Sequence, residues 1–251
     1  MEKNYYKEYY HLERSHWWFC ARGEILLSHL KRVFKGRANI RILNIGVATG
    51  RSSELLMQLG DVTSVEFDKD CYEFSRDVVQ IPIVQGSILD LEFPDNSFDL
   101  VCAFDVIEHV EDDARAVAEM HRVCKKGGVM CVTVPAFMFL WSEHDVVNHH
   151  FRRYTSSILR GLFLDKNESI FHSYFNFWLF FPIAAFRVLA KILPLKKKQT
   201  IEETASDFSV GKGGFLNSLF YHIFKSENAF LKHFIKLPVG VSILSTWRKS
   251  I

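Results

Sequence analysis

The chain has 251 residues, of which 48% are hydrophobic, and a formal net charge of +2 at pH 7. This length can bury a substantial core, and the balanced charge argues against nucleic-acid binding. The five cysteines are odd in number and show no C-x-x-C spacing, which argues against a disulfide framework or a zinc site and favours a reducing compartment. The N-terminal stretch contains no apolar signal core. We therefore expect a cytoplasmic protein.

The first segment is expected to be helical. Apolar residues recur at helical spacing through residues 12–35, and basic residues near the end of this stretch are followed by Gly36. Cations suit the end of a helix, and glycine commonly stops one. We expect residues 1–37 to form an N-terminal helical cap.

Short β-rich runs then alternate with helical patterns. Strands are expected at residues 40–45, 62–66, 82–85, 98–104 and 128–134, and helices at 52–58, 69–79 and 112–124. This alternation predicts βαβ units and a parallel sheet with right-handed crossovers. Ligands of such sheets bind beyond the carboxyl ends of the strands, so each loop that follows a strand is a candidate wall of the site.

The second half of the chain changes character. Residues 169–174 and 240–248 are expected to be strands, separated by a long insertion. The insertion contains an aromatic helix at about 175–193, a polar linker at 196–214 and a second helical pattern at 215–235. We therefore expect a core at residues 38–174, a helical aromatic insertion at 175–238, and a final core strand at 239–251.

The loop "NIGVATG" after the first expected strand has the outline of a nucleotide-binding turn. A dinucleotide fingerprint needs glycine where this chain has Ala48 and Arg51, which disfavours NAD. The spacing instead resembles the first motif, D-x-G-x-G-x-G, of class I S-adenosylmethionine-dependent methyltransferases. The four named positions of that motif fall on Asn44, Gly46, Ala48 and Gly50. The resemblance implies that this loop, including Val47, wraps the methionine end of the cofactor.

Further stretches between residues 38 and 136 resemble the same family in order and spacing. Glu66 ends the second expected strand, where a family carboxylate binds both ribose hydroxyls. Ser87 and Ile88 correspond to the turn beside the adenine, and "AFDVIEHVEDD" to the loop after the fourth strand. The resemblance implies a Rossmann-like, doubly wound, mostly parallel seven-stranded sheet with an antiparallel last strand. It adds to the cofactor site the residues Glu66, Phe67, Ser87, Ile88, Phe104 and Asp105.

Two stretches resemble a narrower, type 11-like bacterial subgroup whose substrates are unassigned. The first is "SHWWFCARGEIL", and the second is "WSEHDVVNHHFRRYT". Arg22 could pair with the carboxylate of the cofactor, and Trp18 could contact the substrate. In the alternative, the tryptophans pin the N-terminal helix to the sheet and Arg22 is solvated.

Polar residues of the second stretch are candidates for chemistry. His144 and His150, together with His109, could act as a general base near neutral pH. Arg152, Arg153 and Tyr154 could bind an anionic substrate group. Alternatively, Asp145 and Arg153 form a network that fixes a loop, and His109 is bound to backbone at a helix terminus. The mixed spacing of these histidines does not predict a metal site.

The apolar stretch at 174–198 has three interpretations. Asn176, Pro182, Arg187 and Lys191 interrupt it, and three lysines follow. Its composition suits a helix in a membrane interface, a lid over an apolar tunnel, or a buried helix packed on the domain or in a dimer. The first would place the protein peripherally at the inner membrane face.

The expected activity is transfer of the sulfonium methyl of S-adenosylmethionine to an oxygen or nitrogen of a small or lipid-linked acceptor by in-line displacement, with S-adenosylhomocysteine as product. Asn44 and Ala48 depart from the family motif. These departures leave open the alternative that the protein is a non-catalytic S-adenosylmethionine-binding or membrane-docking module. An NAD-dependent oxidoreductase is the other alternative. The oligomeric state stays open.

Overall fold

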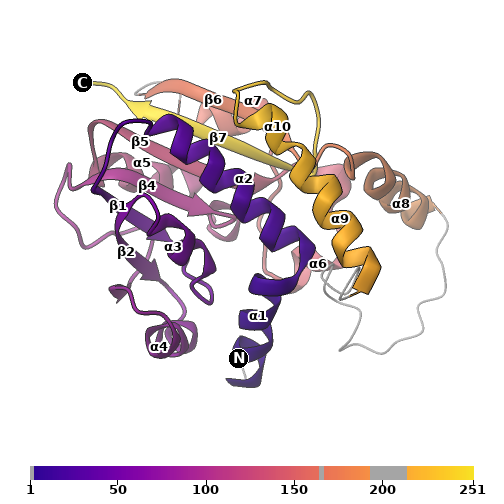
Figure 1. Ribbon diagram of the computed structural model, residues 1–251, viewed down its shortest axis with the longest axis horizontal. Coiled ribbons are helices and arrows are strands. Elements are labelled where there is room, and N and C mark those ends of the chain that lie inside the picture. The colour runs from indigo at the N-terminus through magenta and orange to yellow at the C-terminus, as the bar shows by residue number, and fades with distance from the viewer. Residues whose placement is uncertain (1–2, 164–166, 193–213) are drawn as a thin grey trace.

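The computed structural model describes residues 3–163, 167–192 and 214–251. Seven strands form one sheet in the order β3-β2-β1-β4-β5-β7-β6 (Figure 1). The strands are β1 Ile40–Ile45, β2 Gly60–Glu66, β3 Ile83–Gln85, β4 Phe98–Phe104, β5 Cys124–Pro135, β6 Asn167–Phe175 and β7 Ser242–Lys249. The first five pair in parallel, whereas β7 is antiparallel to both of its neighbours. The expected doubly wound sheet with an antiparallel last strand is confirmed.

Helices of the first half connect the parallel strands. They are α3 Arg51–Leu56, α4 Lys69–Val78 and α5 Asp113–Val123. The carboxylates of Asp68 and Asp112 accept hydrogen bonds from the first turns of α4 and α5, so each helix begins at an acidic cap. Short elements follow β4 and β5: η1 Ile107–His109, η2 Met138–Leu140, α6 Glu143–Val147 and α7 Ser156–Gly161.

The N-terminal cap consists of two helices where periodicity predicted one. They are α1 Lys3–Ser15 and α2 Trp17–Val33. His16 separates them with an extended backbone, and its ring accepts a hydrogen bond from the Trp18 amide at 3.3 Å. Apolar spacing continues through this break, so periodicity alone cannot reveal it.

Helices cover both faces of the sheet. Ile42 belongs to a core cluster shared with Ile25 of α2, whereas its neighbour Leu43 packs in a second cluster with Met120 of α5. This alternation is expected of a strand that is buried on both faces. Figure 1 shows α2 beside α9 (Gly214–Ser226) on one face.

The helical segment that follows β6 begins after Phe175, one residue beyond the expected strand end at 174. Its helices are α8 Phe180–Ile192, α9 and the short α10 Asn228–Leu231. The buried carboxylate of Glu227 accepts hydrogen bonds from the amides of Phe177 at 2.7 Å and Trp178 at 3.1 Å, which ties the α9–α10 corner to the segment before α8. The expected polar linker, apart from Gly214, and the end of the 174–198 stretch lie outside the described residues.

Candidate active site

A cavity of about 1110 Å³ lies at the carboxyl ends of the parallel strands. Ligands of doubly wound sheets bind at this edge. The cavity extends from the loop after β1 to α1, α2 and α8. Small-molecule pockets commonly measure about 300–1,000 Å³, so this cavity has room for a cofactor and a second molecule.

The loop after β1 requires glycine at two positions. Gly46 and Gly50 have φ angles of 77° and 91°, in the left-handed region. A Cβ on Gly46 would lie 2.5 Å from Cγ2 of Val106, and a Cβ on Gly50 would lie 2.2 Å from Cγ2 of Val79. Both the backbone conformation and the close approach therefore exclude side chains here.

Ala48 lies between them and has a left-handed φ of 49°. For a residue with a side chain this conformation costs roughly 1–2 kcal/mol. Its amide donates to Oε2 of Glu66 at 3.1 Å, and its carbonyl accepts from the hydroxyl of Ser75 at 2.5 Å and from Sγ of Cys71 at 3.0 Å. These hydrogen bonds hold the loop against the end of β2 and against α4.

Glu66 ends β2 with only 9% of its surface exposed. Its Oε1 accepts a second backbone hydrogen bond, from the amide of Asp68 at 3.0 Å. Burial raises the pKa of Glu66, although the backbone amides act in the opposite direction. Each carboxylate oxygen keeps a further lone pair, so the pair can accept the two hydroxyl protons of a diol such as ribose.

The residues predicted to bind the cofactor divide into two groups. Those that line the cavity are Arg22, Gly46, Ala48, Glu66, Phe67, Ser87, Ile88, Phe104 and Asp105. The side chains of Asn44 and Val47 are fully buried, and Gly50 caps the start of α3. The side-chain amide of Asn44 donates to the hydroxyls of Ser52 at 3.0 Å and Ser53 at 2.8 Å. Asn44 therefore ties β1 to the start of α3.

Arg22 reaches the same cavity from α2. It is 8% exposed, so the alternative of a solvated arginine is wrong. Arg22 pairs with the carboxylate of Asp105 and donates to Oγ1 of Thr133 at 3.1 Å, and the ring of Trp18 lies 5.0 Å from its guanidinium carbon. Its Nε has no hydrogen-bond partner among the described residues. Trp17 instead packs on Phe220 of α9, with ring centroids 5.5 Å apart.

Glu13 is a cavity residue that the sequence did not reveal. It is 7% exposed and accepts a hydrogen bond from the hydroxyl of Thr49 in the glycine loop. Burial raises the pKa of Glu13, while the Thr49 hydrogen bond lowers it. The neighbouring Arg14 donates to the Thr49 carbonyl at 3.3 Å. No spacing in the sequence indicates that α1 folds over this loop.

The three histidines predicted to act in catalysis all line the cavity. The ring centroids of His109 and His150 are 4.5 Å apart with perpendicular planes, and those of His144 and His150 are 6.0 Å apart. The fold therefore brings the loop after β4 to the segment after α6.

A buried network orients His150. Asp145 accepts hydrogen bonds from Nε and Nη2 of Arg153 at 2.7 and 3.0 Å, and its Oδ1 lies 2.9 Å from Nδ1 of His150. Burial alone would raise the pKa of Asp145, but the hydrogen bonds from His150 and Arg153 hold it well below its usual value. In the neutral form of the ring, this pairing with the carboxylate places the proton of His150 on Nδ1 and the lone pair on Nε2.

The residues predicted to bind substrate are only partly brought together. Trp18 and Arg153 line the cavity, whereas Arg152 and Tyr154 do not. Arg152 pairs with Asp113 at 2.9 Å, and the fully buried hydroxyl of Tyr154 donates to the same carboxylate at 2.8 Å. These two side chains hold the segment to the start of α5.

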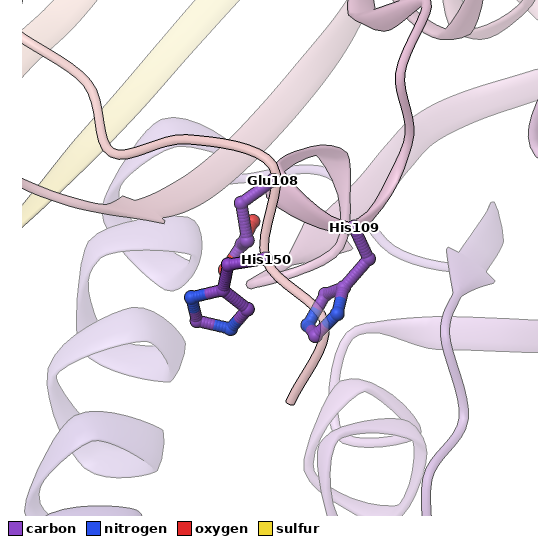
Figure 2. A group of neighbouring side chains, drawn as sticks. All are labelled: Glu108, His109 and His150. Carbon is purple, nitrogen blue, oxygen red and sulfur yellow. The ribbon is translucent and has the colours of Figure 1, made fainter. Parts of the chain in front are cut away.

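Glu108, His109 and His150 form a group with the composition of a metal site (Figure 2). One potential ligand atom from each side chain lies within 4.8 Å of the others. Glu108 is far from His150 in the chain, which is why the sequence did not predict the group.

Several known proteins that are similar to this chain are methyltransferases. Residues 43–132 match the family model described as a methyltransferase domain. A phosphatidylethanolamine N-methyltransferase of Cereibacter sphaeroides is 34% identical over 99 residues, which cover 37% of this chain and 49% of that protein. A demethylmenaquinone methyltransferase of Staphylococcus epidermidis is 35% identical over 100 residues, which cover 36% of this chain and 42% of that protein. The chain thus spans about half the length of these curated relatives.

Among solved structures, a candidate sarcosine dimethylglycine methyltransferase from Galdieria sulphuraria aligns with a TM-score of 0.60. The alignment covers 92% of this chain and 86% of that chain at 16% identity, and so shows the fold alone. The glycine loop, Glu66 and the turn at residues 87–88 all lie within the matched range 43–132. Residues 43–132 therefore match a methyltransferase domain and resemble the class I S-adenosylmethionine-dependent family, which implies S-adenosylmethionine as the cofactor.

Proposed function

We propose that the chain transfers the methyl group of S-adenosylmethionine to an oxygen or nitrogen atom of a lipid or lipid-linked acceptor. One observation carries the proposal: a single cavity joins the glycine loop and Glu66 to an apolar wall formed by α8. Two relatives are named for phosphatidylethanolamine and demethylmenaquinone, both hydrophobic molecules. Their names support an acceptor of this class.

The cofactor end of the cavity suits S-adenosylmethionine. When bound, the cofactor supplies a methyl group on a positively charged sulfur. Glu66 would accept the ribose hydroxyls, while Ser87 and the amide of Ile88 would contact the adenine. Arg22 remains paired with Asp105 and could offer its unpartnered Nε to the cofactor carboxylate. Because methyl transfer quenches charge on sulfur, the main contribution of these residues is to hold the reactants in line.

The acceptor end is apolar. Pro182, Ile183 and Phe186, at helical spacing on α8, line the cavity. Other apolar side chains of α8 face outward: Phe181, Leu189 and Ile192 are 56%, 55% and 68% exposed. A helix with an inner face on the cavity and exposed apolar residues outside suits a membrane interface, from which a lipid could enter. Within the described ranges, no helix is both long enough and apolar enough to cross a bilayer.

The two charged residues of α8, Arg187 and Lys191, lie toward the protein. Lys191 donates to the carbonyl of Phe139 at 2.8 Å, and Arg187 lines the cavity. An acceptor hydroxyl or amine must lose a proton during transfer, and a neutral histidine at the cavity wall can take it. We assign this role to His144, which lines the cavity with its ring centroid 6.0 Å from that of His150.

The test measures release of S-adenosylhomocysteine by the full chain. Amine-headed phospholipids and hydroxylated quinone lipids, presented in anionic vesicles, would be compared with water-soluble amines and phenols. We expect turnover with at least one lipid class. If the chain binds S-adenosylmethionine but releases no product with any acceptor, the non-catalytic alternative is correct. If calorimetry shows tighter binding of NAD, the oxidoreductase alternative is correct.

Membrane contact has a separate test. The double variant Leu189→Asp/Ile192→Asp places charges on the outer face of α8, so its co-sedimentation with anionic vesicles should fall at least fivefold. Ile158→Asp, at a 54% exposed position on α7, is the matched control and should co-sediment like the unaltered chain. An unaltered chain that stays in the supernatant would remove the membrane from the proposal and leave methyl transfer untouched.

A further inference from the structure

Glu108 is a buried acid whose carboxylate has no hydrogen-bond partner among the described residues. The residue is fully buried, and neither oxygen accepts a hydrogen bond from any described residue. The side chain nevertheless belongs to the lining of the cavity. A buried carboxylate without hydrogen bonds is unfavourable, and it either takes up a proton or meets a cation. The cavity gives a cation access to Glu108.

Two arginines of the cavity wall are engaged by other carboxylates. Arg22 pairs with Asp105, and Arg153 binds Asp145 through two hydrogen bonds of 2.7 and 3.0 Å. Glu108 is thus a third carboxylate in a region where two guanidinium groups are each paired with another acid. Neither guanidinium donates a hydrogen bond to Glu108.

Two imidazole rings lie beside this carboxylate. His109 follows Glu108 in η1, and His150 comes from the segment after α6 (Figure 2). The Nδ1–H of His150 is held by Asp145, which leaves the lone pair on Nε2. In metal sites, the ring nitrogen of a histidine that does not bind the metal commonly donates to a carboxylate, as Nδ1 of His150 does to Asp145. The carboxylate fixes the orientation and tautomer of the histidine.

We propose that Glu108, His109 and His150 bind one divalent transition-metal ion of the Zn²⁺ class and leave one coordination position open toward the cavity. Two imidazoles and one carboxylate suit such an ion better than Mg²⁺, which prefers oxygen ligands. Ligand atoms around a tetrahedral zinc are about 3.4 Å apart, as its bond lengths near 2.1 Å require. Because the potential ligand atoms here lie within 4.8 Å of one another, modest side-chain rotations complete the site.

The open position lies within the cavity that holds the proposed acceptor. An acceptor oxygen bound there would lose its proton more readily, because a divalent ion lowers the pKa of a bound hydroxyl. His144, which also lines the cavity, could then take that proton. This role in activation rests on the proposed methyl transfer, whereas metal binding itself does not.

The test titrates chelator-treated, dialysed full chain with Zn²⁺, Mn²⁺ and Mg²⁺ by calorimetry, without cofactor or acceptor. Co²⁺ absorption reports the coordination geometry. We expect one Zn²⁺ per chain, Zn²⁺ binding tighter than Mg²⁺ binding, and at least tenfold weaker Zn²⁺ binding in Glu108→Gln and His109→Gln. His222→Gln, which alters an exposed histidine of α9, is the control and should bind like the unaltered chain.

His109→Gln should fold even if Glu108→Gln does not, because His109 lies at an exposed position whereas Glu108 is in the core. Each variant would also be checked by thermal unfolding and by its affinity for S-adenosylmethionine, which should stay within threefold. Absence of saturable Zn²⁺ binding, a preference for Mg²⁺, or unchanged affinity in a folded His109→Gln variant would overturn the metal site. Metal-free protein that keeps full methyl transfer would refute the activation role alone.

Discussion

Replacement of Glu66 by glutamine is the most direct probe of the cofactor site. The carboxylate accepts amide hydrogen bonds from Ala48 at 3.1 Å and Asp68 at 3.0 Å. Glutamine keeps the shape but turns one acceptor oxygen into an NH₂ group that faces an amide donor, and it removes the charge available to the ribose hydroxyls. Hydrogen bonds to charged groups contribute about 1.5–3 kcal/mol each. Loss of one such interaction should weaken S-adenosylmethionine binding roughly 10–100-fold.

Calorimetric titration with S-adenosylmethionine and S-adenosylhomocysteine measures this change. Asp99→Asn is the matched control, because Asp99 also accepts a backbone hydrogen bond, from Arg41 at 3.0 Å, but lies at the amino end of β4. Its affinity should equal that of the unaltered chain. Burial raises the pKa of Glu66 above the usual 4.5, and only the ionised form accepts both hydroxyls. Affinity should therefore fall as the pH is lowered through this raised pKa, and the glutamine variant should not show this decline.

A dissociation constant for Glu66→Gln within twofold of the unaltered value would refute the assignment of Glu66 to the ribose. Because the same carboxylate also accepts a hydrogen bond from the amide of Ala48, weaker binding by the variant has two possible causes. Thermal unfolding of the variant separates a loss of ligand contact from a loss of loop structure. A melting temperature close to that of the unaltered chain, together with weaker binding, supports the ligand contact.

Three further substitutions test other parts of the structure. Gly46→Ala should lower the free energy of unfolding by about 2–4 kcal/mol, because its Cβ meets Val106 at 2.5 Å on top of the strain of a positive φ. Gly127→Ala, with φ of 70° but no described atom near the added Cβ, measures the strain alone, and equal losses in denaturant titrations would contradict the clash. Burial raises the pKa of Glu227 to about 7 from 4.5, so its stabilising contribution is complete below pH 4.5 and is lost as the pH rises through 7, on the order of 3 kcal/mol. Glu227→Gln should flatten this decline in urea titrations between pH 4.5 and 8, and parallel pH profiles would contradict it. Tyr154→Phe removes a buried hydrogen bond to Asp113 and should lower the free energy of unfolding by about 1 kcal/mol. The affinity for S-adenosylmethionine should not change, and a changed affinity would show that Tyr154 contributes to the binding site.

Local pattern was sufficient for much of the fold. The apolar runs of β1 and β4 were predicted with the bounds observed, because strands buried on both faces are continuous apolar segments between polar turns. Glu66 was placed correctly at the end of β2, since the end of such a run is visible in the sequence. The break at His16 was not, because it depends on a single backbone conformation that apolar spacing does not record.

The composition of the cavity wall, by contrast, was decided by the tertiary structure. The polar residues in "HHFRRYT" do not by themselves predict that Arg153 lines the cavity while Tyr154 is buried against Asp113. Glu13 reaches the glycine loop, and Glu108 meets His150, only because separate elements pack at one edge of the sheet. Periodicity and loop motifs report interactions between near neighbours in the chain. Side chains that converge from distant segments acquire their surroundings, and hence their chemistry, only when the sheet and its helices have assembled.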